Sequence, residues 1–298
     1  MSDLKLGVDV GGSRIKFGVV QKGRVIERAL VPMKCSDPQT LVQLISQTAH
    51  RLCAQGGYTF EEIGIGVAAV MTQGGHEIIQ SPNMPWLNGA PIRSMLQSKH
   101  KAPVFCENDA NCVGWGEAVA GAGSTKGDQI CLALGTGVGG SLILNGMLFR
   151  GVRGRGAELG HINIDPNGPL CGCGGRGCLE QYASKTGLLR MLKEFGSLTA
   201  CDDPIVELFN QARAMDPVAR HIVRIAGRAL GQGLANLNHL FGVQTVILAG
   251  GIAGAADLLL PHLHQRTQQL KSSALTVQVG TLGNDAGVIG AAQLSGAG

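Results

Sequence analysis

One histidine and three cysteines lie within a short stretch of this 298-residue chain and could bind a metal ion. They belong to the segments GRGAELGH, residues 154–161, and CGCGGRGCLE, residues 171–180. The group is His161, Cys171, Cys173 and Cys178. One imidazole and three thiolates suit tetrahedral zinc, and four protein ligands would make the site structural. Because the C-x-C spacing is tighter than usual for zinc, the spacing alone also leaves a redox pair open, although a C-x-x-C motif is absent.

A second group of polar residues follows a predicted strand. The motif ENDAN, residues 107–111, comes directly after APVFC. In α/β proteins the carboxyl end of a strand faces the cleft where ligands bind. Asp109 is therefore a candidate general base for a substrate hydroxyl, and Asn108 is a candidate hydrogen-bonding ligand. The alternative is that these residues cap a helix over 110–119. Asn83, in the rigid loop SPNMP, has a similar ambiguity.

Two glycine-rich turns after predicted strands are candidate phosphate sites. Gly11-Gly12-Ser13 follows LKLGVDV, and GTGVGGS, residues 135–141, follows ICLAL. Successive glycine N–H groups form a concavity that binds anions, although each turn alone could be a simple turn. Asp9 would stand where Mg²⁺ and its waters need a carboxylate. The spacing G-x-G-x-x-G begins at Gly135 and at Gly172, but neither match joins a strand to a helix, which excludes a Rossmann dinucleotide site.

The elements around these residues predict an α/β fold with a duplicated β-meander. Residues 4–31 and 130–151 both read as strand, glycine turn with GGS, strand, short turn and strand. Helical periodicity marks residues 38–54 and 216–240. The apolar runs IGIGVAAV, APVFC and TVILAGG are typical of interior strands, and the alternation of strands with helices predicts mixed sheets.

The same pattern predicts two lobes. The first covers residues 1–117 and is completed by a C-terminal helix at about 285–298. The second covers residues 118–284 and holds the zinc loop, residues 161–180.

Composition narrows the possible classes of protein. Glycine accounts for 46 residues, about twice the usual share of ~7%, which indicates many tight turns and close backbone approaches. The net charge is +4, and the only dense basic group, Arg150, Arg153 and Arg155, is too short to indicate nucleic-acid binding. The sequence lacks a signal peptide and a long apolar run, so we expect a cytoplasmic protein with reduced thiols. The six other cysteines are expected to be small buried hydrophobes.

Taken in order, these motifs resemble the ROK family of sugar kinases and related repressors. The match comprises LGVDVGGSRIK, SPNMP, ENDAN, LGTGVGGSLILNG, GRGAELGHI, CGCGGRGCLE, VILAGGI and DAGVIGAA, over nearly the whole chain. The resemblance implies a two-lobed actin-like ATPase (ribonuclease H-like) fold. The repressors of this family carry a helix-turn-helix segment before the first strand, and only about four residues precede that strand here, so we expect no DNA binding by that route.

The resemblance also implies roles for individual residues. Asp109 matches the catalytic base. The residues that match sugar ligands are Asn83, Asn108, Asp109, Glu158, His161 and Glu180. The zinc ligands are the His161 and cysteine group described above. The residues expected to bind Mg²⁺–ATP are Asp9, Gly11, Gly12, Ser13, Gly135, Thr136, Gly137, Gly250 and Gly251.

The resemblance implies an ATP-dependent hexokinase. Asp109 would deprotonate the primary (6-) hydroxyl of a hexose, glucose first among them, as that hydroxyl attacks the γ-phosphate of ATP bound between the lobes. A homodimer is implied as well. Two hypotheses from other classes are a catalytically silent sugar sensor of the same fold and a chaperone-like or actin-like ATPase.

One departure from the family pattern affects the choice of sugar. Family glucokinases usually read G-x-P-G where this chain has Gly66-Val67-Ala68-Ala69. A methyl group at Ala69 could narrow the sugar pocket, and a small change in a pocket alters discrimination by roughly 1–3 kcal/mol. Fructose, mannose, allose and N-acyl hexosamines (N-acetylmannosamine or N-acetylglucosamine) therefore stay open beside glucose.

Overall fold

The computed structural model describes residues 4–196, 201–272 and 274–298 and divides into two compact α/β units. The first unit comprises Met1–Asp128, Ser141–Ala157 and Thr281–Gly298. The second comprises Gln129–Gly140 and Glu158–Gly280. The chain thus passes from one unit to the other at four points, whereas the sequence pattern predicts a single crossing near residue 117 and a return near residue 285. Those lobe boundaries stay a prediction.

A mixed five-stranded sheet forms the centre of the first unit, in the order β3-β2-β1-β4-β7. β1 pairs antiparallel with β2, and β2 with β3, while β4 and β7 run parallel to β1. The strands are β1 (Leu4–Val10), β2 (Arg14–Gln21), β3 (Arg24–Pro32), β4 (Glu62–Val67) and β7 (Val104–Asn108). A short two-stranded sheet of β5 (Val70–Met71) and β6 (Ile78–Gln80) follows β4 in the chain.

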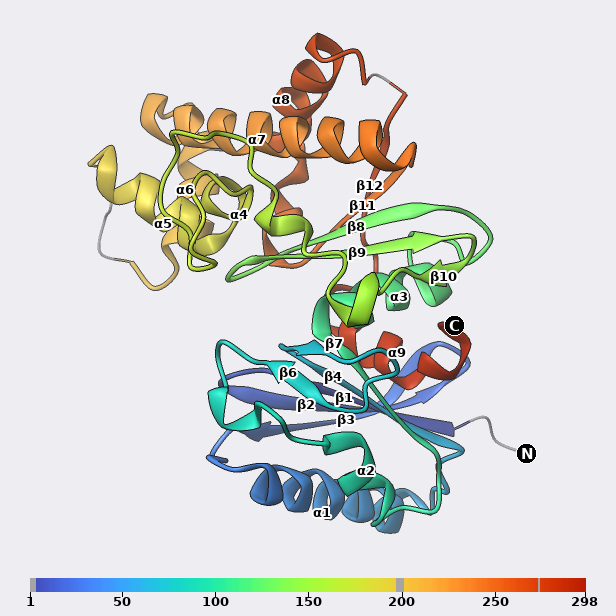
Figure 1. Cartoon of the computed structure of the whole chain (residues 1–298). Helices are drawn as coiled ribbons and strands as arrows, with labels where there is room; N and C mark the ends of the chain where they lie inside the picture. Colours follow the sequence, from blue (N-terminus) through green and yellow to red (C-terminus); the bar gives the residue numbers. More distant parts are fainter. Residues whose placement is uncertain (1–3, 197–200, 273) are drawn as a thin grey trace. The chain divides into compact units, whose positions relative to one another are not determined.

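Helices cover both faces of this sheet (Figure 1). α1 (Pro38–Gly56) begins at Asp37, whose carboxylate accepts the N–H of Thr40, and packs its apolar stripe against β1, β2 and β4 in one core. α2 (Ile92–Gln97) contributes Ile92 and Leu96 to the same core. α9 (Ala286–Ala292) covers the opposite face and packs on α3 (Asp109–Ala120).

Glycines allow α9 to approach the sheet closely. A methyl group at Gly7 would overlap the carbonyl oxygen of Val288, and one at Gly64 would overlap that of Ala291. Alternate residues of a strand face opposite sides of the sheet. The large neighbours Leu6 and Ile65 therefore point to the α1 core while the glycines point to α9.

The second sheet repeats the topology of the first, in the order β10-β9-β8-β11-β12. Its strands are β8 (Gln129–Leu134), β9 (Val138–Leu144), β10 (Met147–Leu148), β11 (Thr245–Ala249) and β12 (Thr276–Val279). β11 runs parallel to β8 and to β12, and β10 runs antiparallel to β9. The predicted duplication and the predicted α/β class are thus confirmed. The prediction of a strand over 147–151 was too long, because β10 ends at Leu148 and a positive-φ glycine, Gly151, follows.

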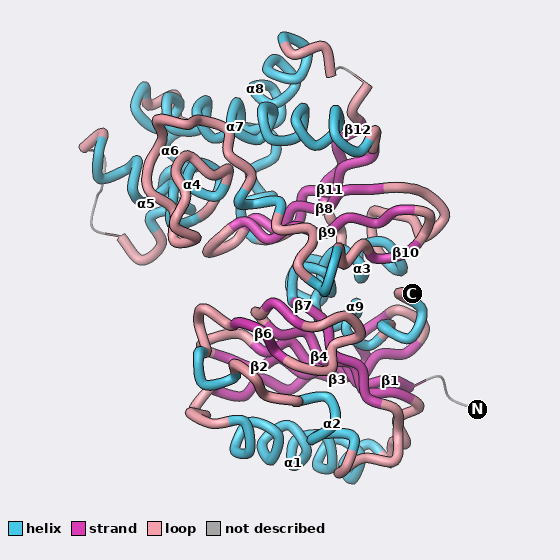
Figure 2. Tube along the Cα trace, viewed as in Figure 1, coloured by secondary structure: helices cyan, strands magenta, loops and turns pink. Residues whose placement is uncertain are grey.

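The helices of the second unit gather around the long helix α7 (Figure 2). Asp216 caps α7 (Pro217–Phe241) through the N–H of Ala219, as its Asp-Pro start predicts. The other helices are α4 (Glu180–Ala183), α5 (Lys185–Glu194), α6 (Pro204–Arg213) and α8 (Ala256–Gln269). Among the described residues, every helix is too short or too polar to cross a membrane.

The glycine contact with α9 gives a stability prediction. We expect Gly64→Ala to lower the free energy of unfolding by about 1–3 kcal/mol or more, because the backbone of α9 must move to admit the methyl group. Gly127→Ala is the matched control, since a methyl group there meets no atom within 4 Å. Urea unfolding of both variants measures the difference, and equal stabilities would show that α9 does not constrain this position.

Candidate active site and metal centre

The carboxyl ends of β1, β4 and β7 lie at one edge of the first sheet. The parallel register aligns Asp9 with Gly66 and Gly66 with Glu107, so the three residues lie side by side across the strands. One residue further along, Val10, Val67 and Asn108 are aligned in the same way. With strands ~4.8 Å apart, the backbones of Asp9 and Glu107 are separated by about 10 Å. The sheet therefore presents the Asp9 turn and the ENDAN motif at the same edge.

Asp9 lies directly across from Lys16 in the antiparallel pair of β1 and β2. The Lys16 Nζ donates to the Asp9 carboxylate at 2.9 Å. In the turn that follows Asp9, the amide of Gly11 donates to the carbonyl of Arg14 at 3.1 Å, so the turn itself uses this N–H. The exposed loop residue Asn83 is a neighbour of the turn, since a methyl group on Gly12 would lie 3.7 Å from its Cβ.

Asn108 caps α3, as one of its two sequence interpretations predicts. Its Oδ1 accepts the N–H of Asn111 at 3.1 Å, and its Nδ2 donates to the carbonyl of Ala69 at 3.2 Å. A side-chain amide has two N–H donors and two acceptor lone pairs. Capping therefore leaves Asn108 one donor and one acceptor for a ligand, and the two interpretations are compatible.

Asp109 is the first residue of α3 and is half-buried. Its Oδ1 accepts the N–H of Ala110 at 2.9 Å. This contact fixes the side chain at the N-terminus of the helix, where the helix dipole favours a negative charge. The arrangement places a carboxylate at the start of α3, at the edge of the sheet.

The methyl group of Ala69 belongs to the core of the first unit. Ala69 is 3% exposed and lies in the same buried cluster as Met71, Ile78 and Met84. Its amide donates to the carbonyl of Val67 at 2.7 Å. The extra methyl group is thus covered by apolar side chains, which differs from the sequence expectation that it narrows a sugar pocket.

In the second unit, glycine turns follow the neighbouring parallel strands β8 and β11. Ala133 is in register with Ala249, so Gly135 and Gly250 leave the sheet at the same edge. Gly250 has a φ of 87°, and a methyl group there would overlap the carbonyl oxygen of Leu134. The turn after β8 is held by α5, because the Lys185 amide donates to the Gly135 carbonyl at 2.8 Å and the Thr186 hydroxyl donates to that of Thr136 at 2.9 Å.

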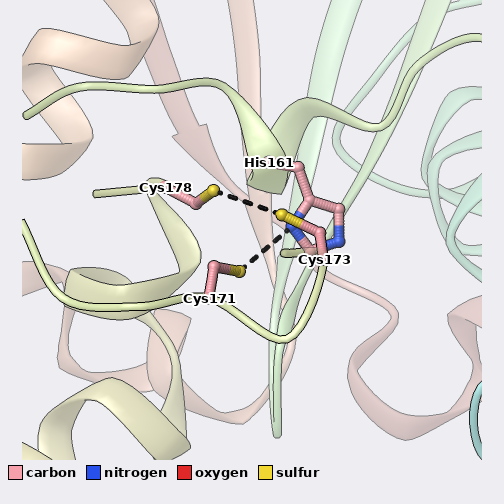
Figure 3. Close-up of side chains that lie close together, drawn as sticks. All are labelled: His161, Cys171, Cys173 and Cys178. Carbon is pink, nitrogen blue, oxygen red and sulfur yellow. Dashed lines mark hydrogen bonds between the residues drawn. The ribbon is translucent and has the colours of Figure 1, made fainter. Parts of the chain in front are cut away.

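The predicted metal ligands converge in the loop before α4 (Figure 3). The ligand atoms of His161, Cys171, Cys173 and Cys178 all lie within 4.8 Å of one another. The Nδ1 of His161 is 3.5 Å from the Sγ of Cys171, and the sulfurs of Cys173 and Cys178 are 3.6 Å apart. Zn–S bonds of ~2.3 Å and Zn–N bonds of ~2.0 Å place neighbouring tetrahedral ligands about 3.5–3.8 Å apart. The donor set and its spacing therefore fit a zinc ion.

Backbone contacts shape this loop for the metal ligands. Gly177 has a φ of 59°, and its carbonyl accepts the amide of Ile164 at 2.9 Å. The N–H of Gly175 donates to the Cys173 sulfur and lowers the pKa of that thiol, whereas burial raises the pKa of the Cys178 thiol to about 12. A thiolate is the form that binds metal. The loop thus stabilises one thiolate by itself and leaves the buried one to a cation.

Glu180 connects this loop with the turn after β8. Its Oε2 accepts the amide of Val138 at 3.1 Å, and its Oε1 lies 3.8 Å from the Cys171 sulfur. A methyl group at Gly137 would overlap the Glu180 carboxylate, so a larger residue there would displace this side chain. Glu158 lies one short turn before His161, and its carbonyl accepts the His161 amide at 3.0 Å. Glu180 therefore lies beside the candidate metal ligands, and Glu158 joins them through its backbone.

A partly buried ion pair lies next to Asp109 and was not expected from the sequence. The Arg150 Nε donates to the Glu107 carboxylate at 2.6 Å, and the two side chains are 18% and 9% exposed. Arg150 was noted in the sequence only as part of a basic cluster. The available signal was a glutamate inside the ENDAN motif, next to two residues with proposed chemistry and directly after the apolar residues Val104–Cys106 of the strand.

Comparisons with known proteins agree with this architecture. The ROK family profile matches residues 5–297. A glucokinase from Streptomyces coelicolor is 33% identical, over 98% of this chain and 97% of its own. The structure of a ROK family glucokinase from Streptomyces griseus in complex with glucose and AMPPNP is 33% identical, with a TM-score of 0.80 and 98% of both chains covered.

A xylose repressor from Bacillus subtilis is 32% identical, over 86% of this chain and 66% of the repressor. Glucokinases and a repressor thus share the same architecture with this chain. A profile match over almost its whole length, together with these identities, shows that the chain belongs to the ROK family.

Proposed function

We propose that this protein is an ATP-dependent hexokinase that transfers the γ-phosphate of ATP to the primary (6-) hydroxyl of a hexose, with glucose as the first candidate. The observation that carries the proposal is the placement of Asp109 at the start of α3, beside Asn108, at the ligand-binding edge of the first sheet. Further support comes from the 33% identity to a glucokinase over nearly the whole chain.

Asp109 is the proposed general base. Its carboxylate accepts the proton of the hexose hydroxyl as that oxygen attacks the γ-phosphorus, and the bond from phosphorus to the β-phosphate oxygen breaks. Asn108 uses its remaining donor and acceptor to orient the hydroxyls of the sugar, and Asn83 adds a second amide from its exposed loop. Glu158, His161 and Glu180 are the proposed sugar ligands of the second unit.

The phosphate groups of ATP are proposed to bind to the glycine turns. The amide of Gly11 donates within its turn, and the amide of Gly135 donates to the carbonyl of Gly137 at 3.0 Å. We therefore expect the phosphates to be bound by the amides of Gly12, Ser13, Thr136 and Gly137. Gly250 and Gly251 complete the set on the adenosine side. A Mg²⁺ ion bound with ATP would neutralise charge on the phosphates, and Asp9 is a suitable carboxylate for its waters.

Zinc is the proposed structural ion of the second unit. His161 would use Nδ1 as the ligand, which leaves Nε2 free to face a sugar hydroxyl. The zinc ion would hold the loop in one conformation when bound. The loop in turn fixes the N-terminus of α4, where Glu180 lies.

Glucose is favoured among the hexoses because the one departure from the glucokinase pattern, the methyl group of Ala69, lies in the core. The departure is therefore not expected to change the sugar pocket. Fructose, mannose, allose and N-acyl hexosamines are the alternatives. The sugar sensor is the alternative from another class, since a repressor shares the fold. Asp109 and both glycine turns are present, which supports the kinase. We further propose a cytoplasmic homodimer that binds neither nucleic acid nor membranes.

The proposal is tested by ADP release from the purified protein with ATP, Mg²⁺ and a panel of hexoses and amino sugars. Glucose should give the highest kcat/KM. Turnover with another sugar alone would correct the substrate, and ATP hydrolysis that is independent of sugar would indicate an ATPase. Failure to turn over any sugar that it binds would indicate the sensor.

Replacing the base should abolish transfer and leave sugar binding intact. We expect Asp109→Asn to lower kcat by about 10²–10⁴-fold, because Asn cannot accept the proton. Titration calorimetry should give a hexose affinity close to that of the unchanged protein. Asp37→Asn, at an exposed helix cap where Asn is an equally good capping residue, is the control. An Asp109→Asn protein with normal turnover would rule out this base.

Ala69→Gly tests the expectation about sugar choice. Because the methyl group lies in the core, its removal should leave the ratio of kcat/KM values between glucose and mannose unchanged. The free energy of unfolding should fall by about 1 kcal/mol, from lost packing and greater backbone freedom. A changed sugar ratio at unchanged stability would mean that the methyl group faces the substrate.

The metal site is tested by zinc analysis. We expect about one zinc per chain, and Cys178→Ser should lose it, because this buried sulfur is one of four ligands. Cys201→Ser, at an exposed cysteine in the same unit, should retain the metal. Calorimetry should also show weaker hexose binding after chelation. A metal-free protein with full hexose affinity would contradict the role of the loop.

A further inference from the structure

The ion pair between Glu107 and Arg150 lies next to the residues proposed to do the chemistry. Glu107 is the penultimate residue of β7 and precedes Asn108 and Asp109 directly. Its side chain is buried on the sheet face that packs against α3, the same face as Phe105. All of these residues belong to the first unit.

The Glu107 carboxylate holds both sides of the turn that presents Asp109. Its Oε1 accepts the backbone N–H of Asn108 at 2.9 Å and the Nδ2 of Asn111 at 3.0 Å. Asn111 in turn donates its own backbone N–H to Asn108 Oδ1. Asp109 is therefore flanked on each side by a residue that is bonded to the same carboxylate.

Arg150 provides the positive charge for this buried carboxylate and is itself held in place. Its Nε donates to Glu107 Oε2 at 2.6 Å, and its Nη1 donates to the carbonyl oxygen of Gly298 at 2.6 Å. Its backbone carbonyl accepts the amide of Gly156 at 2.8 Å. The guanidinium has little freedom to leave Glu107.

An ion pair in this place does more than an apolar pair of the same size could do. Buried ion pairs contribute little net stability compared with well-packed apolar residues. An apolar residue at position 107 would leave the Asn108 amide and the Asn111 side chain without their acceptor. The presence of a carboxylate at position 107 is thus explained by the turn that it holds. The presence of Arg150 is explained by the negative charge of Glu107, which it balances.

Other charges around Asp109 are accounted for. Asp9 on β1 is paired with Lys16 on β2. Burial raises the pKa of the Cys106 thiol to about 12 and that of the Cys112 thiol well above its usual value, so both are neutral. Burial is the main cause for Cys112, and the nearby charges of Glu107, Asp109 and Asp9 raise its pKa further. α9, which packs on α3, carries only apolar residues and glycine.

We propose that Glu107 and Arg150 are positioning residues for the phosphoryl transfer: Glu107 holds the Asn108 backbone amide and the Asn111 side chain on either side of Asp109, and Arg150 cancels the charge of Glu107 at the base. The inference rests on the proposed function, since it takes Asp109 as the base. It also assigns a role to one arginine of the basic cluster, which is too short to indicate nucleic-acid binding.

The test compares pH profiles of kcat/KM for the hexose in single and double variants. Glu107→Gln leaves Arg150 unbalanced, which stabilises ionised Asp109 and moves the acidic limb to lower pH. Arg150→Met leaves Glu107 unbalanced and moves the limb to higher pH. Each shift should be about half to one pH unit, the usual size for one added charge near a partly exposed carboxylate. The double variant should return the limb towards its original position.

Several controls separate positioning from general destabilisation. Arg28→Met removes a second arginine–carboxylate pair of the same unit, with Asp285 at the surface, and should leave the profile unchanged. Arg150→Lys keeps the charge and should keep the limb in place even if kcat falls. Circular dichroism across the pH range monitors folding. If Arg150→Met does not fold, the inference still requires that the acidic limb of the Glu107→Gln profile move to lower pH.

The outcomes distinguish this inference from the proposed function. Opposite shifts in the two single variants support the charge balance. A uniform loss of activity with an unmoved limb would show a structural role only and overturn the inference. If Asp109→Asn keeps both turnover and the acidic limb, the assignment of the base fails and the inference fails with it. If Asp109→Asn removes turnover while the single variants leave the limb unmoved, only the positioning role is lost.

Discussion

The arrangement of the first unit depends on the close approach of α9 to its neighbours. Gly7 and Gly64 admit the helix on the sheet side, and Gly116 and Gly290 admit it on the α3 side, where methyl groups would overlap backbone oxygens. α9 therefore holds α3 at a fixed distance from β1 and β4. Since Asp109 is the first residue of α3, this backbone contact also sets the position of the proposed base. The glycines that allow the close packing of α9 therefore also determine where Asp109 lies.

In the second unit, polar contacts and a candidate metal site hold the proposed sugar ligands in place. The segment 171–178 of this unit carries no apolar side chains besides cysteine, and the four candidate metal ligands gather there with His161 among them. Glu180 extends this order to the turn after β8 through the Val138 amide. The Glu180 carboxylate, at the start of α4, thus contacts both a candidate metal ligand and the glycine turn. In the first unit the Glu107 carboxylate has a similar role, because it holds the residues on either side of Asp109.

Much of this could be predicted because it depends on local sequence. The two meanders, the Asp216 cap of α7 and the zinc ligand set each follow from short-range patterns of glycine, capping residues and ligand spacing. The end of β10 was misplaced, because Phe149 continues the apolar pattern beyond Leu148, where the strand ends, and a positive-φ glycine follows at Gly151. The role of Asn108 was left between a cap and a ligand, since hydrogen-bond capacity can be counted only once its partners are known.

The family, the duplicated α/β class and the residue types available for phosphate, sugar and metal follow from the sequence alone, because ordered motifs and the chemistry of side chains carry them. The burial of Ala69 in the core, and the pairing of Arg150 with Glu107 instead of a surface position beside its basic neighbours, are visible only in the folded chain. The physical reason is that burial and charge pairing depend on residues far apart in the chain. Glu107 and Arg150 are 43 positions apart, and no local pattern relates them.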